Sequence, residues 1–172
     1  MERIPKMLNY LNDDLTKELQ NWKQQLSNLK AEKTKATIEQ FKDQAETEET
    51  CIVITYLRSS YITKKHQFKI ALYEKAPFTK ETTMYQYMNL SALYKQVPAQ
   101  MENFTKKLQT KYSSVLNSEI EEIRRAYMEL LYQNTNQFFE NVLAKIPKTK
   151  PTIKVYFGEE LDEVKEIGVI EQ

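Results

Sequence analysis

Apolar residues recur every three or four positions along residues 98–146, and this spacing predicts one long amphipathic helix, or two helices in line. Pro98 suits the first turn of a helix, where no backbone N–H is needed, and Pro147 ends the run. The main apolar stripe consists of Met101, Phe104, Leu108, Tyr112, Val115, Ile120, Ile123, Tyr127, Leu130, Phe138 and Val142. A second apolar line beside it consists of Leu116, Leu131, Phe139 and Leu143. Because the combined apolar arc is broad, we expect more than one element to cover this helix.

A leucine-rich pattern predicts a second long helix over residues 5–45. Its apolar positions follow one another in steps of three and four: Leu8, Leu11, Leu15, Leu19, Trp22, Leu26 and Leu29. The spacing resembles a coiled-coil seam, but it persists for only about three heptads. We therefore favour an amphipathic helix that packs on its own domain, and keep the coiled coil as the alternative.

Three further segments complete the expected elements. Residues 51–74 predict a β-hairpin, because residues 51–57 are β-branched or apolar on both faces and residues 66–73 alternate between apolar and polar positions. A short helix is expected within residues 79–97, which follow the hairpin. Residues 152–170 predict a strand or a hairpin, since their first half alternates cleanly.

The order of these elements predicts a single domain over residues 1–172, with residues 79–146 helical. The expected fold is α+β and helix-dominated. Two long helices and a short helix would pack with a small, mostly antiparallel sheet of three to four strands, which is the natural way to bury these apolar faces.

Composition excludes several kinds of functional site. The chain has two glycines, whereas glycine-rich phosphate-binding loops need several close together. One cysteine and one histidine cannot form a zinc site of the usual Cys/His type. We therefore expect no cofactor and no metal. The formal net charge of +1 does not by itself indicate nucleic acid. No run is apolar enough to span a membrane, and a single cysteine fits a reducing compartment, so a cytoplasmic location is expected.

The predicted hairpin is locally basic, with no acidic residue between Cys51 and Tyr73. Cations interleaved with aromatic rings are what contacts to phosphates and stacked bases require. The candidate nucleic-acid contacts within residues 58–69 are Arg58, Tyr61, Lys64, Lys65 and Lys69. The alternative is a solvated hairpin whose lysines discourage edge-to-edge pairing, and we favour it.

Cys51 and His66 invite the hypothesis of a nucleophile and its base. A turn centred near residues 61–62 would place Cys51 opposite Leu72 or Tyr73, several residues from His66 along the strand. Because cysteines in apolar strands are usually small buried hydrophobes, we expect no catalytic pair.

Glutamates in the predicted long helix suggest a second possible site. Glu119 and Glu122 are three residues apart, but carboxylate sites in helix bundles normally add histidines at matching spacing. Glu121 and Arg125 have the spacing and order of an ordinary intrahelical ion pair. No metal site is therefore expected here.

Eleven tyrosines are the most unusual feature of the composition. A tyrosine buries a large ring and keeps a polar tip, which suits interfaces and equally the wet edge of a core. The candidate partner surface consists of Tyr85, Tyr94, Leu116, Leu131, Phe139 and Leu143.

These patterns together favour a non-enzymatic protein–protein interaction module or accessory subunit of a larger cytosolic assembly. The expected partner is another protein or a second copy of this chain, and no membrane. A nucleic-acid-associated protein using the basic hairpin is the first alternative. A small enzyme of unknown class is the second.

Overall fold

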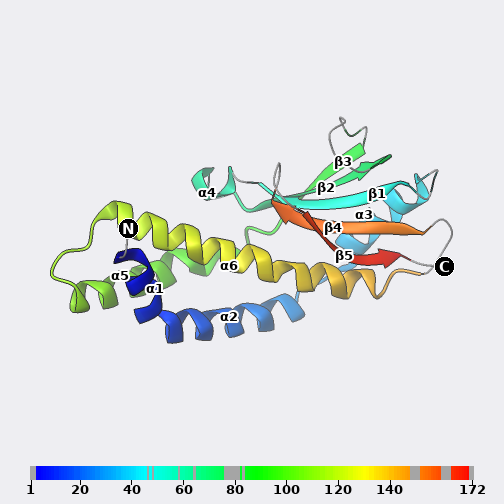
Figure 1. Cartoon of the computed structure of the whole chain (residues 1–172). Helices are drawn as coiled ribbons and strands as arrows, with labels where there is room; N and C mark the ends of the chain where they lie inside the picture. The colour runs from blue at the N-terminus through cyan, green and yellow to red at the C-terminus, as the bar shows by residue number, and fades with distance from the viewer. Residues whose placement is uncertain are drawn as a thin grey trace. The chain divides into compact units, whose positions relative to one another are not determined.

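The chain folds into an α+β structure with one long helix and a five-stranded mixed sheet, shown in Figure 1. The computed structural model describes residues 3–45, 47, 49–57, 59–63, 65–75, 82, 84–147, 152–159 and 164–170. The helices are α1 (Arg3–Tyr10), α2 (Asn12–Ser27), α3 (Glu32–Asp43), α4 (Ser60–Thr63), the 3₁₀ helix η1 (Leu93–Gln96), α5 (Val97–Lys111) and α6 (Asn117–Leu143). The strands are β1 (Cys51–Tyr56), β2 (Gln67–Tyr73), β3 (Met84–Asn89), β4 (Ile153–Glu159) and β5 (Val164–Ile170).

The chain divides into two compact units. The helical unit consists of Met1–Asn28 and Ala92–Asn134, and the sheet unit of Leu29–Ser91 and Thr135–Gln172. Helix α6 contributes its N-terminal part to the helical unit and its C-terminal part to the sheet unit. The single domain expected over residues 1–172 stays a prediction.

The expectation of two long helices is wrong, because among the described helices only α6 is long. The segment 5–45 forms α1, α2 and α3, and the helix expected over residues 98–146 is divided into α5 and α6. The chain leaves the helical conformation at Tyr112, whose φ of −114° and ψ of 133° are extended. Apolar spacing continues across these breaks, so periodicity alone does not reveal them.

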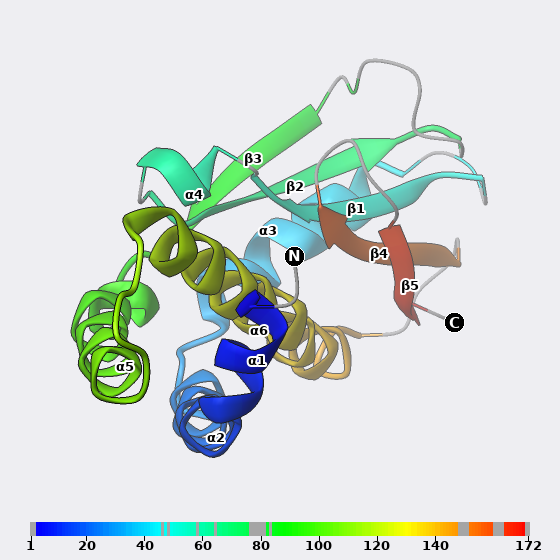
Figure 2. The same cartoon turned by 60° about the vertical axis from the view of Figure 1, so that its left-hand side comes forward.

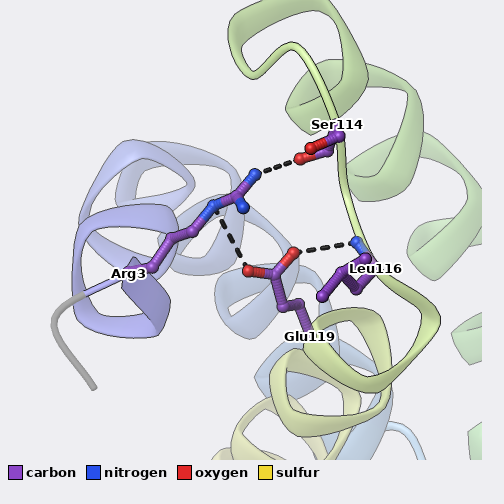
Figure 3. Close-up of polar contacts among 4 residues, drawn as sticks. All are labelled: Arg3, Ser114, Leu116 and Glu119. Carbon is purple, nitrogen blue, oxygen red and sulfur yellow. Dashed lines mark hydrogen bonds and ion pairs between the residues drawn. The ribbon is translucent and has the colours of Figure 1, made fainter.

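Polar contacts from a distant part of the helical unit hold the junction between α5 and α6 (Figure 3). The Leu116 N–H donates to Glu119 Oε2 at 2.8 Å, which satisfies a backbone donor at the start of α6 in the manner of a capping box. Arg3 Nε lies 3.2 Å from Glu119 Oε1, and the same guanidinium donates to the Ser114 carbonyl. Arg3 thus connects the helix cap to the linker before it.

The sheet has the strand order β3-β2-β1-β4-β5, with five strands rather than the expected three or four. β1 pairs antiparallel with β2 and parallel with β4, and the two outer pairs are antiparallel. The predicted hairpin is confirmed, with Cys51 opposite Tyr73. The additional strand is β3, which lies where a short helix was expected. Its residues Met84, Tyr87 and Met88 fit the period of a helix as well as that of a strand.

One face of the sheet is covered by α3 and the C-terminal part of α6, which lie on the same side in Figure 2. Rings of the sheet meet α6 there: Phe139 lies 5.7 Å from Phe68 and 5.6 Å from Phe157, measured between centroids. Two hydroxyls of α3 reach β3, since Thr37 Oγ1 donates to Gln86 Oε1 at 3.1 Å and Thr34 Oγ1 lies 2.8 Å from the sulfur of Met88. We call this side the covered face.

Candidate functional site

The opposite side of the sheet carries tyrosines from three strands, and we call it the tyrosine face. Residues that pair directly across strands share a face, so the registers define it. Its members include Tyr73, Tyr85, Tyr87 and Tyr156, with Lys69, Ala71, Val53 and Thr55 between them. The small central residues are buried, whereas Tyr85 and Tyr87 on the edge strand are 55% and 47% exposed. The tyrosine face therefore presents its large exposed rings at β3.

The two exposed tyrosines are held in a defined arrangement. The rings of Tyr85 and Tyr87 have centroids 5.6 Å apart and planes inclined at 69°, an edge-to-face contact. The ammonium of Lys69 lies 5.4 Å from the centroid of the Tyr85 ring, within the range of a cation–π interaction. These contacts restrict the side-chain freedom of the two exposed rings.

The backbone of β3 offers a second kind of contact. In an antiparallel pair, alternate residues direct their N–H and C=O groups toward the neighbouring strand. The Leu90 N–H donates to the His66 carbonyl at 3.0 Å, in register with the pairing of β2 and β3. The peptide groups of Tyr85, Tyr87 and Asn89 consequently point away from β2, toward the edge of the sheet.

Within its described residues, Met84–Asn89, the edge strand β3 carries no charge, proline or bulge that would hinder strand pairing. Natural edge strands are protected by charges, prolines or bulges. The sequence of β3, MYQYMN, contains no charged residue and no proline, and its register with β2 is continuous. The other edge strand, β5, contains Lys165 and Glu166, and its register with β4 shifts between Val155 and Tyr156. Of the two edges, β3 is the one suited to bind a further strand.

The helical unit contains a groove of about 370 Å³ between α2 and α5. It is lined by Asp14, Lys17, Glu18, Gln100, Asn103, Phe104, Lys106 and Lys107. Four of its polar residues bond in pairs: Lys107 Nζ lies 2.5 Å from Asp14 Oδ1, and Gln100 Nε2 donates to Glu18 Oε2 at 2.7 Å. The buried Tyr127 hydroxyl donates to Gln100 Oε1 at 2.9 Å, and burial raises the pKa of this phenol. These bonds are explained by the packing of the two helices.

The residues expected to form a partner surface differ in exposure and are divided between the two units. Tyr85 and Leu116 are exposed, but they belong to different units. Tyr94, Leu131 and Phe139 are buried, so these three contribute to cores rather than to an exposed surface. Leu143 is half-buried, and its Cδ1 lies 3.1 Å from the position that a Cβ would take on Gly168.

The three described candidate nucleic-acid contacts lie in different elements of the sheet unit. Arg58 and Lys64 lie outside the described residues. Tyr61 is half-buried in α4, Lys65 is exposed just before β2, and Lys69 lies within β2 on the tyrosine face. Among the described members, Lys69 lies close to an exposed aromatic ring, that of Tyr85.

Cys51 and His66 do not form a catalytic pair. Cys51 is opposite Tyr73 at one end of β2, and His66 precedes the first residue of that strand at its other end. At about 3.4 Å per residue, the seven residue steps from His66 to Tyr73 correspond to roughly 20 Å or more. Burial raises the pKa of the Cys51 thiol to about 11, so the reactive thiolate is scarce at neutral pH.

The buried thiol predicts a loss of stability in alkaline solution. Below about pH 9 the thiol is protonated in the folded and the unfolded chain alike. Between about pH 9 and pH 11 the unfolded chain loses this proton while the folded chain retains it, so the free energy of unfolding falls as the pH rises, by about 2–3 kcal/mol. Urea titrations from pH 8 to pH 11 measure this slope. The Cys51→Val variant should have a shallower slope, and identical slopes would contradict the prediction.

Two acidic residues of α6, Glu119 and Glu121, have structural partners. Glu119 binds Arg3 and the Leu116 N–H, and Glu121 pairs with Arg124 at 2.6 Å, not with Arg125 as expected from spacing. Within the described part of the chain, no group of three His, Cys, Asp or Glu residues could hold a metal ion. None of the described helices combines the length and the apolar character needed to cross a bilayer.

The sequence reasoning overlooked Tyr87 and Tyr156 as site residues. The available signal was the alternation Tyr85-Gln86-Tyr87, whose period of two is typical of a strand.

Comparison of the chain with protein-family models, with curated proteins and with solved structures gave no match.

Proposed function

We propose that the chain is a non-enzymatic protein-binding module, an accessory subunit of a larger cytosolic assembly, that contacts its partner through β3. The observation that supports this most strongly is the exposure of Tyr85 and Tyr87 side by side on an uncharged edge strand. Tyrosine is enriched at interfaces and at the residues that contribute most of the binding energy. The burial of Cys51 and the ion pairs of Glu119 and Glu121 also favour binding over catalysis.

The proposal is tested by removing the two exposed rings. Tyr85→Ser together with Tyr87→Ser should weaken binding of the partner by at least about tenfold, because each ring is placed to act as an anchor. The measurement is affinity capture by the tagged, purified chain from an extract of its own cells, with the captured proteins quantified by mass spectrometry.

Tyr10→Ser is the matched control, since Tyr10 is another exposed tyrosine, 42% accessible, and belongs to the helical unit. The control variant should retain the partner. Equal capture by the double variant and by the unchanged chain would contradict the role of β3.

Binding of single-stranded nucleic acid is a second candidate, favoured by the contact of Lys69 with the Tyr85 ring. A labelled single-stranded oligonucleotide would then bind with strong salt dependence. This binding would be lost when Lys64, Lys65 and Lys69 are changed to alanine. Fluorescence polarisation at two salt concentrations makes this measurement. No binding at low salt, or binding unchanged by the triple substitution, would exclude this candidate.

A further inference from the structure

We infer that the partner binds β3 as an added sixth strand, supplied by an extended acidic peptide. This inference rests on the proposed function and names the chemistry of the partner. Strand addition obtains its affinity from main-chain hydrogen bonds and its specificity from alternate side chains. The peptide groups of Tyr85, Tyr87 and Asn89 provide the main-chain donors and acceptors along the outer side of β3.

Cations lie beside this edge on both faces of the sheet. On the covered face, Lys33 of α3 lines a small depression together with Gln86, Tyr87 and Met88 of β3. On the tyrosine face, Lys69 lies beside Tyr85. β3 has no charged residue of its own, and among the described residues these two ammonium groups are cations that lie beside it. An incoming strand with carboxylates on both of its faces would meet a cation on each side.

A second copy of the chain fits this edge less well. Its own β3 has no carboxylate to place against Lys33 or Lys69. A twofold axis through the middle of β3 would also bring Lys33 toward the Lys33 of the other copy, and like charges in contact disfavour pairing.

The test uses peptides of known sequence and three single variants of the intact chain. Random heptapeptides displayed on phage are selected against the immobilised chain, and the enriched sequences are remade as fluorescent peptides for titration. We expect enrichment of peptides in which Asp or Glu is interspersed with β-branched or aromatic residues. Replacing their acidic residues with lysine should lower the affinity by at least about tenfold.

Tyr87→Pro removes one outward N–H. It removes no hydrogen bond to β2, because the Tyr87 N–H points away from that strand, and proline is tolerated at such edge positions. It should weaken binding of the acidic peptide by at least about tenfold, whereas Tyr87→Val, which retains the N–H, should weaken it less. Lys33→Glu should reduce the preference for acidic over basic peptides. Circular dichroism shows whether each variant is folded. If the proline variant does not fold, the valine and glutamate variants still test the inference.

Four results would overturn the inference: no enriched peptide, enrichment of basic peptides, an unchanged preference in Lys33→Glu, or self-association that Tyr87→Pro abolishes. Its failure differs from failure of the proposed function. If the double serine variant loses its partner but no acidic strand is selected, the protein-binding role stands and the strand-addition mode is wrong.

Discussion

Replacing Phe139 with alanine is expected to lower the free energy of unfolding by about 3–5 kcal/mol. The Phe139 side chain is fully buried, and its ring lies 5.3–5.7 Å from the rings of Phe68, Phe138 and Phe157. Truncation would remove these contacts and leave a cavity between α6 and the sheet, which close-packed neighbours fill only in part. Urea denaturation followed by far-ultraviolet circular dichroism measures the change.

The Phe139→Leu variant is the control, because it keeps an apolar side chain of similar reach and should lose less stability than the alanine variant. The comparison decides between two roles for this residue. A core residue lowers stability on truncation, whereas a residue of an exposed partner surface lowers binding and leaves stability nearly unchanged. An alanine variant as stable as the unchanged chain would contradict the core assignment and support the prediction that Phe139 belongs to a partner surface.

The strands that the sequence predicted correctly are those whose pattern has a single interpretation. β1 is a continuous β-branched and apolar run, and it is buried along its whole length as a central strand should be. β4 alternates with Ile153, Val155 and Phe157 inside, and these three are buried. In both strands, local propensity and the tertiary environment agree, so periodicity was sufficient.

The elements that the sequence missed depend on distant contacts. The interruption between α5 and α6 is held by Arg3, which is 111 residues from Ser114 in the chain. Strand β3 is a strand because β2 supplies its partner, although its methionines and tyrosines fit a helical period equally well. Neither contact is encoded within a local window of sequence.

The candidate site was predictable only in its residue type. Tyrosine richness indicated an interface or a wet core edge, and the structure contains both cases. Tyr85 is exposed because it lies on an edge strand, whereas Tyr94 is buried against other rings of the helical unit. The sequence analysis placed both tyrosines on one candidate partner surface. Their difference in burial could not be predicted there, because it depends on the neighbours that the fold provides.

Replacing Tyr94 with alanine should also lower the free energy of unfolding by about 3–5 kcal/mol, for this reason. The Tyr94 side chain is 2% exposed, and its ring lies 4.6 Å from Trp22 and 5.4 Å from Tyr132. Trp22 is the only tryptophan of the chain, so its fluorescence reports on the altered site directly. We expect red-shifted emission, since loss of the neighbouring ring admits water to the indole. Urea denaturation followed by this fluorescence measures the stability change.

Tyr94→Phe keeps both ring contacts and removes only the hydroxyl, so it should lose about 1 kcal/mol. An alanine variant with normal stability but reduced partner binding would contradict the core assignment. The same experiment tests the single-domain prediction, because Tyr94 belongs to the helical unit and Phe139 to the sheet unit. In one cooperative domain, each variant would shift the fluorescence and the circular dichroism transitions by the same amount. Transitions that separate in either variant would instead show that the two units unfold independently.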